Sequence, residues 1–221
     1  PGLAYHRYGG NTPCVEMTCG DKTLIFDAGT GLRSLGQELV KKGKIEAEIF
    51  FSHAHLDHII GFPFFAPAFH PKNKFKIWSA VFDQQIPIKE VFKKLTSSPM
   101  FPVSFEIFNA QFDFLTFKPG DEIDVDEKIS LSTVELNHPQ GAVGYRVNFA
   151  GKSVCYITDT EHKSGIIDQN IKSLVSGADV VIYDACFTDE NYANYTGWGH
   201  STWQEGVKLC DAASVKKLII F

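Results

Sequence analysis

The stretch Ser52-His53-Ala54-His55-Leu56-Asp57-His58 places four metal-capable side chains within six residues. Such closely spaced groups cannot share one face of a helix, where only residues three or four apart are neighbours. They can converge on a tight loop that leaves a strand. Residues 45–51 just before them end in an apolar, aromatic stretch, which is typical of a strand. Imidazole and carboxylate groups together suit zinc, or else manganese or iron. Because the motif offers more ligands than one catalytic ion with an open position can use, it predicts part of a two-metal site.

Three later segments carry side chains of the same chemistry. Asn137-His138-Pro139 has an isolated histidine before a turn, and Tyr156-Ile157-Thr158-Asp159-Thr160 has an aspartate where an apolar strand ends. Gly199-His200-Ser201-Thr202 opens a predicted helix. Taken alone, His138 could be a surface turn residue and Asp159 a strand-end cap. The dense motif upstream favours metal ligation for both.

The motif His53-x-His55-x-Asp57-His58, followed by these segments in order, resembles the metallo-β-lactamase superfamily over nearly the whole chain. His-Ser-Thr at 200–202, after Asp184-Ala185-Cys186-Phe187, is similar to the phosphodiesterase branch. That branch holds ribonuclease Z, the tRNA 3′-processing endonuclease, and small cyclic-phosphate phosphodiesterases. The resemblance implies an α/β fold of the four-layer αβ/βα sandwich type, whereas the sequence pattern alone indicates only a mixed α/β domain.

The resemblance also implies a set of metal ligands. The set is His53, His55 and His138 for a first ion, Asp57 and His58 for a second, and Asp159 as a bridge between them. We expect zinc in both places, with manganese or iron as alternatives. Two such ions lower the pKa of a bridging water, and the resulting hydroxide would attack phosphorus. Family members carry one more histidine after the strand at 217–221, so we expect the missing ligand just beyond Phe221.

The resemblance further implies catalytic roles for Asp57, His200 and Asp184. His200 would protonate the leaving alkoxide, which is a difficult part of phosphodiester hydrolysis. Asp184 stands where ribonuclease Z has an acidic partner, and it would orient His200 and keep it protonated. The plain alternatives are that His200 only neighbours a helix cap and that Asp184 only caps a strand. Asp27 is expected to hydrogen-bond a ligand histidine.

Composition places limits on the class of protein. At 221 residues and 24.6 kDa we expect one hydrolase domain, cut at both ends from a longer sequence, since the chain does not begin with Met. The net charge of −5 argues against a polyanion as the main substrate, so nucleic acid is not favoured. Five scattered cysteines without a CxxC pair predict no disulfide framework and a reducing cytoplasm. No apolar run reaches the length of a membrane span.

Apolar periodicity and turn residues predict the elements. Strands are expected at 14–19, 23–27, 45–51, 75–79, 143–149, 153–157, 180–183 and 217–221, with further short strands in 105–135. Helices are expected at 30–42, capped by Thr30, and at 86–95, 168–176 and 201–213, with a short one after residue 56.

Together these features predict a dinuclear metal-dependent hydrolase that cleaves a phosphodiester bond of a small substrate, such as a cyclic nucleotide or cyclic sugar phosphate. Three alternatives stay open: a ribonuclease Z-like endonuclease, a thioester or lactone hydrolase, and a non-catalytic sensory domain of the same fold. The aromatic segment 62–69 is either core or a wall for a ring-shaped substrate, and Tyr192, Tyr195 and Trp198 could line a pocket. A homodimer is open, because superfamily relatives often form one.

Overall fold

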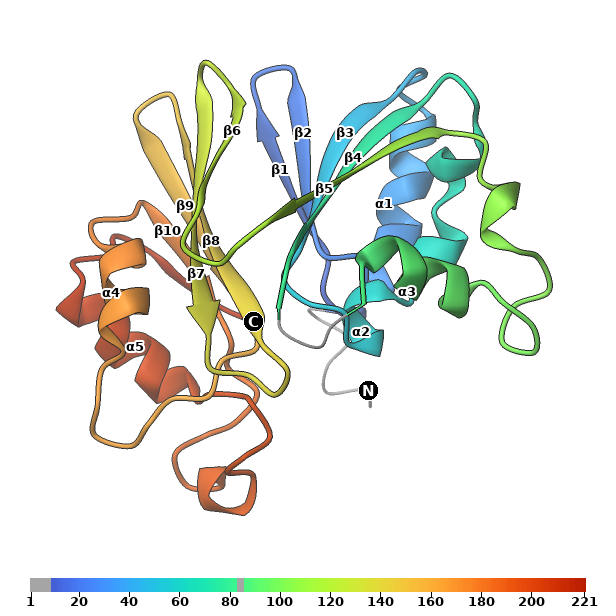
Figure 1. Ribbon diagram of the computed structural model, residues 1–221. Coiled ribbons are helices and arrows are strands. Elements are labelled where there is room, and N and C mark those ends of the chain that lie inside the picture. The colour runs from blue at the N-terminus through green and yellow to red at the C-terminus, as the bar shows by residue number, and fades with distance from the viewer. Residues whose placement is uncertain (1–8, 83–85) are drawn as a thin grey trace. The chain divides into compact units, whose positions relative to one another are not determined.

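The computed structural model describes residues 9–82 and 86–221, and it comprises two compact units, Pro1–Thr116 and Phe117–Phe221. Each unit has one β-sheet with helices packed on it (Figure 1). Among the described residues, no helix is both long and apolar enough to cross a bilayer.

The sheet of the first unit has the strand order β1-β2-β3-β4-β5. Its strands are β1 (Val15–Cys19), β2 (Lys22–Phe26), β3 (Glu46–Phe51), β4 (Lys74–Ala80) and β5 (Gln111–Phe117). Strands β2, β3 and β4 run parallel, whereas β1 is antiparallel to β2. The helices are α1 (Gly31–Val40), α2 (Leu56–Ile59) and α3 (Ile88–Leu95), with 3-10 turns at Phe62–Phe64, Ala66–Phe69 and Phe105–Ile107.

Helices α1 and α3 supply apolar side chains to the core of this unit. Leu32 and Leu39 of α1 and Phe92 of α3 belong to the same buried cluster as Ile49 of β3 and Ile77 of β4. Strand β3 is buried at every position after its first residue, as expected for a central parallel strand with both faces covered. The loops at the ends of the parallel strands are thus attached to the most buried part of the unit.

The aromatic segment at 62–69 serves mainly as core. Phe62 and Phe65 are fully buried, and the ring of Phe62 stacks on Phe92 with centroids 4.0 Å apart. Only Phe64 is largely exposed among the three phenylalanines at 62–65. Core packing therefore accounts for most of the segment.

The sheet of the second unit has the order β11-β10-β9-β8-β7-β6. Its strands are β6 (Glu122–Asp126), β7 (Ile129–Leu136), β8 (Ala142–Phe149), β9 (Lys152–Ile157), β10 (Val180–Tyr183) and β11 (Leu218–Ile220). Neighbours from β6 to β9 pair antiparallel, and β9, β10 and β11 run parallel. The helices are α4 (Gln169–Val175) and α5 (Trp203–Ala212), and a 3-10 turn lies at Tyr192–Asn194.

Helices α4 and α5 cover one face of this sheet (Figure 1). Val175 of α4 and Leu209 of α5 share a buried cluster with Ile157 of β9 and Val181 of β10. The side chain of Asp168 caps α4 by accepting hydrogen bonds from the backbone N–H groups of the first turn. Strand β9 joins the antiparallel and parallel parts of the sheet, because it pairs antiparallel with β8 and parallel with β10.

Most predicted elements form within one or two residues of their expected bounds, and the predicted hairpin of β8 and β9 is present. Thr30 is the N-cap residue of α1, as predicted, but its side chain bonds elsewhere. Its side chain makes no capping bond; its hydroxyl accepts from the backbone N–H of Thr12 and donates to the side-chain oxygen of Asn11. Thr30 therefore joins α1 to the segment before β1.

Candidate metal and catalytic site

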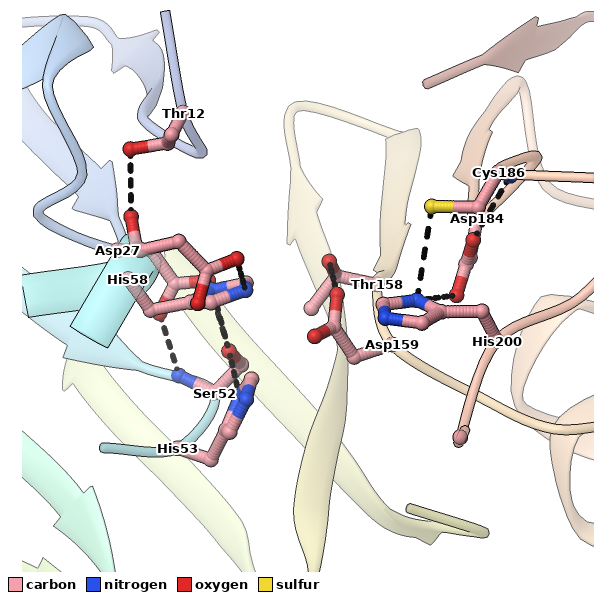
Figure 2. Close-up of polar contacts among 12 residues, drawn as sticks. Thr12, Asp27, Ser52, His53, His58, Thr158, Asp159, Asp184, Cys186 and His200 are labelled. Atoms are coloured by element: carbon pink, nitrogen blue, oxygen red, sulfur yellow. Dashed lines mark hydrogen bonds and ion pairs between the residues drawn. The ribbon is translucent and has the colours of Figure 1, made fainter. Parts of the chain in front are cut away.

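In the first unit, the candidate residues follow the carboxyl ends of two parallel strands. Phe26 of β2 lies opposite Phe50 of β3, and the N–H of Asp27 donates to the carbonyl of Phe50 at 2.9 Å. Because neighbouring parallel strands end at the same edge of a sheet, Asp27 lies beside the loop that begins at Ser52. Figure 2 shows Asp27 turned toward Ser52 and His58.

Asp27 holds this loop through three hydrogen bonds. Its Oδ1 accepts from the N–H of Ser52, and its Oδ2 accepts from the Ser52 hydroxyl, each at 2.7 Å. Oδ2 also lies 2.8 Å from Nδ1 of His58, so the expected bond between Asp27 and a predicted ligand histidine is present. A carboxylate can only accept, so Nδ1 of His58 carries the proton and the lone pair of the ring is on Nε2.

The same logic orients His53. Because the Ser52 hydroxyl donates to Asp27, its oxygen accepts from Nδ1 of His53 at 3.0 Å, which again leaves the lone pair on Nε2. Nε2 of His58 and Oδ2 of Asp57 are 3.3 Å apart. Two ligands about 2.0–2.1 Å from one tetrahedral ion lie about 3.4 Å apart, so this pair fits a single ion.

A close backbone contact supports the loop. Thr12 donates its hydroxyl hydrogen to the carbonyl of Asp57 at 2.6 Å, and the N–H of Gly61 donates to the carbonyl of Ala28 at 2.8 Å. A Cβ at Gly61 would overlap the carbonyl oxygen of Gly29, and one at Gly29 would overlap that of Asp57. Glycine is therefore required at both positions for the loop to lie this close to β2.

In the second unit, the candidates again lie beyond strand ends that point the same way. Strands β7 and β9 run in one direction because both are antiparallel to β8, and β10 is parallel to β9. Their carboxyl ends are followed by His138, Asp159 and Asp184, respectively. The N–H of Asp184 donates to the carbonyl of Ile157 at 2.9 Å, which aligns the last two loops.

His138 and Asp159 form the second half of the candidate ligands. Nδ1 of His138 lies 2.8 Å from the carbonyl oxygen of Gly199, so it donates there and keeps its lone pair on Nε2. That Nε2 is 3.6 Å from Oδ2 of Asp159, again the spacing of two ligands of one ion. Asp159 has a left-handed φ of 34°, and Thr158 donates to its Oδ1 at 2.7 Å. Such an unfavourable backbone conformation, held in place by contacts, is typical of functional positions.

Asp184 and His200 form the predicted pair. Oδ2 of the buried Asp184 lies 2.9 Å from Nδ1 of His200 and also accepts from the N–H of Thr160 at 3.1 Å. The hydrogen bond to Asp184 first, and one to Cys186 second, raise the pKa of His200 to about 11. His200 is therefore an imidazolium at neutral pH. One proton lies on Nδ1, which donates to Asp184, and the other lies on Nε2.

The sequence did not identify Glu161 as part of this arrangement. Its carboxylate accepts from the N–H of Gly197 at 2.8 and 2.9 Å and from that of Gly199 at 2.8 Å, and its backbone carbonyl accepts from Asn137 at 2.7 Å. Glu161 thereby fixes the carbonyl that orients His138. A glutamate directly after Thr158-Asp159-Thr160 is the only hint in the sequence, because its partners lie 36 and 38 residues away.

Aromatic rings lie next to His200. Phe187 stacks on Tyr195 with centroids 4.3 Å apart, and Tyr195 meets Trp198 edge-on at 5.4 Å. Phe187 lies 6.1 Å from the His200 ring, and Trp198 is 62% exposed. Of the expected pocket residues, Tyr195 and Trp198 belong to this group, whereas Tyr192 stacks elsewhere, on His162.

Residues 22–221 match a family model described as the beta-lactamase superfamily domain. The chain therefore belongs to the β-lactamase superfamily. Ribonuclease Z from Exiguobacterium sp. strain AT1b is 36% identical over 107 residues, which are 48% of this chain and 31% of that protein. The matched part thus spans about a third of that relative's length.

Two solved structures share the fold. Human tRNase Z, short form, has a TM-score of 0.70 at 17% identity, over 95% of this chain and 85% of that one. A diphosphatase from the PhnP family has a TM-score of 0.67 at 20% identity, over 95% and 72%. The expected αβ/βα sandwich class and the resemblance to the ribonuclease Z branch are confirmed.

Proposed function

We propose that the chain is a dinuclear metal-dependent hydrolase that cleaves a phosphodiester bond. One observation carries this proposal: His53, His58 and His138 are each held through Nδ1, so that Nε2 presents the lone pair. Histidines that bind metals commonly donate their other N–H to an oxygen in this way. Three rings fixed in the same tautomer by three separate partners are not needed for folding alone.

The proposed ligands follow the family resemblance. They are His53, His55 and His138 for one ion, Asp57 and His58 for the other, and Asp159 as the bridge. Zinc fits nitrogen and oxygen donors at the spacings described, with manganese or iron as alternatives. When bound, two divalent ions lower the pKa of a bound water and offset the negative charge of the phosphate.

His200 is the proposed proton donor. The hydrogen bond from Nδ1 to Asp184 fixes the ring and keeps it positively charged, which leaves the Nε2 proton for the leaving alkoxide. Asp184 is buried, with 2% of its surface exposed, so it acts through His200 rather than on the substrate. Asp57, with its side chain half exposed, is the carboxylate that a substrate can reach in the first unit.

A small phosphodiester, such as a cyclic nucleotide or cyclic sugar phosphate, is the proposed substrate. The rings of Phe187, Tyr195 and Trp198 beside His200 would contact a ring of the substrate, such as a nucleobase. A net charge of −5 does not favour a nucleic acid. The 36% identity to ribonuclease Z over 107 residues makes tRNA cleavage the second candidate.

We propose that the protein works in the cytoplasm. The five cysteines form no disulfide, which suits a reducing cytoplasm. A homodimer and a single domain formed by both units are proposed from the family resemblance alone.

The test is the metal content per chain of the full-length protein, measured together with turnover of bis-p-nitrophenyl phosphate. Two ions and turnover support the proposal, and cyclic nucleotides and a tRNA precursor then separate the two substrate candidates. Two ions without diester cleavage would direct the search to thioesters and lactones. An active-site content of one ion or none would favour a non-catalytic binding domain.

A further inference from the structure

Three different metal-ligating groups meet beside the proposed proton donor in the second unit. Asp184, Cys186 and His200 each offer one ligand atom, and these atoms lie within 4.8 Å of one another. Sγ of Cys186 is 3.6 Å from Nδ1 of His200, on the same side of the ring as Oδ2 of Asp184 at 2.9 Å (Figure 2). A carboxylate, a thiol and an imidazole thus face one point.

The spacing of the sulfur and nitrogen atoms matches that of two ligands of one tetrahedral ion. Bonds of about 2.05 Å to nitrogen and 2.3 Å to sulfur place those two ligands about 3.6 Å apart, which is the distance between His200 and Cys186. Nitrogen and oxygen ligands of zinc lie about 3.4 Å apart. The carboxylate of Asp184 would need to move by only about 0.5 Å from its hydrogen-bonded position.

The cluster is held in place yet open to solvent. Asp184 is fixed by the N–H of Thr160 at 3.1 Å and by that of Cys186 at 3.2 Å. Cys186 is exposed, and the side chain of His200 is 23% exposed, so an ion can enter from solvent. A thiol with an imidazole favours soft or borderline cations over magnesium or calcium.

We propose that Asp184, Cys186 and His200 form an additional, inhibitory site for a thiophilic divalent cation such as zinc or cadmium. Binding replaces the thiol proton of Cys186 and the Nδ1 proton of His200, and both protons pass to solvent. The hydrogen bond between Nδ1 of His200 and Asp184, on which the proposed proton donor depends, is thereby lost. The inhibition rests on the proposed role of His200 as proton donor, whereas the binding does not.

Cadmium binding to the full-length holoenzyme tests the site directly. A cadmium–thiolate bond gives a charge-transfer absorption band in the ultraviolet, and the proposed catalytic ligands contain no sulfur, so exchange there gives no band. We expect the band to saturate at one equivalent and to be lost in Cys186→Ser. The matched control is Cys14→Ser, which removes the partly buried thiol of the first unit and should keep the band. A band that survives Cys186→Ser would overturn the proposed site.

Turnover of bis-p-nitrophenyl phosphate tests the inhibition, with each variant compared to its own rate without cadmium. We expect half-inhibition of Cys186→Ser to need at least about tenfold more cadmium than that of the unsubstituted chain, because one of three ligands is lost. A Cys186-dependent band with equal inhibition of both proteins would overturn the inhibitory role. A protein without turnover would refute the proposed function, and the band would still decide whether the site exists.

Discussion

Nδ1 of His138 lies 2.8 Å from the carbonyl oxygen of Gly199, 61 residues further along the chain. Gly199 has a φ of +82°, and a Cβ there would overlap the His138 ring and Pro139. We therefore expect Gly199→Ala to turn His138 away and weaken metal binding by about 10- to 100-fold, as loss of the group that orients a ligand typically does. Titration with a competing chelator measures this affinity.

Gly151→Ala is the matched control for that substitution. Gly151 has a similar φ of +72°, but nothing lies within 4 Å of the position of its Cβ. The same backbone strain is introduced far from His138, in the turn between β8 and β9. Equal losses of metal affinity in both variants would refute the role of the Gly199 carbonyl.

Glu161→Ala removes the carboxylate that binds the N–H groups of Gly197 and Gly199. The loop before His200 then loses its anchor, so we expect both metal affinity and kcat to fall by about tenfold or more. Glu161→Gln keeps one acceptor oxygen, so its metal affinity and kcat should lie between those of the unsubstituted protein and those of Glu161→Ala. Glu127→Ala, in the turn between β6 and β7, serves as the control; a Glu161→Ala protein no different from it would contradict the anchoring role.

Asp27→Asn changes a fully buried carboxylate that accepts three hydrogen bonds. The amide NH2 of asparagine must face a donor, either in Ser52 or in His58, so one buried group is left unsatisfied. We expect the free energy of unfolding to fall by about 1–3 kcal/mol, measured by urea denaturation of the metal-depleted protein. Asp21→Asn, in the exposed turn between β1 and β2, should change it little, and equal effects would argue against the hydrogen-bond account.

His200→Ala should lower kcat by about 10²- to 10⁴-fold while the metal content stays unchanged. Because Asp184 and Cys186 raise the pKa of His200 to about 11, activity should persist through neutral pH and fall on the alkaline side. Bound cations disfavour the charged form of His200 and so oppose part of this rise in its pKa. Asp184→Asn removes its largest cause, so the alkaline fall should move to lower pH; an unmoved profile would exclude His200 as the titrating acid.

The same pKa shift affects stability. A group whose pKa is raised on folding stabilises the folded state fully below its unfolded value, about 6.5 for histidine. That contribution declines as the pH rises and is lost by about pH 11.

Trp198→Ala removes the exposed ring that meets Tyr195 beside His200. Stacking on a base or similar ring contributes about 1–3 kcal/mol, so we expect KM for an aromatic diester to rise with kcat less affected. Trp203→Ala, at the start of α5, removes another exposed tryptophan as a control. An equal rise of KM in both variants would show that the ring of Trp198 does not bind the substrate.

The part of the site that could be predicted lies within short stretches of chain. The loop at 53–58 could be predicted because its proposed ligands are neighbours in sequence. Strand β10 forms at the predicted residues because a short apolar run rich in β-branched residues favours a buried strand. The bond between Asp27 and His58 could be expected because both follow the carboxyl ends of strands.

The parts that could not be predicted depend on partners distant in sequence. Thr30 has a typical capping side chain, yet the nearby Thr12 and Asn11 satisfy its hydroxyl instead. Glu161 looks like any polar loop residue until the fold brings Gly197 and Gly199 to it. Local propensity is a weak guide wherever a tertiary partner competes for the same group.

The contact between Gly29 and Gly61 sets a boundary for protein engineering. Neither position accepts even a methyl group, because the backbones there already touch. A randomised library that includes these two codons would consist mostly of inactive members, whatever substrate is used for selection. Directed evolution toward a new substrate should hold both codons constant and vary exposed positions such as Leu56, Phe64 and Trp198 instead.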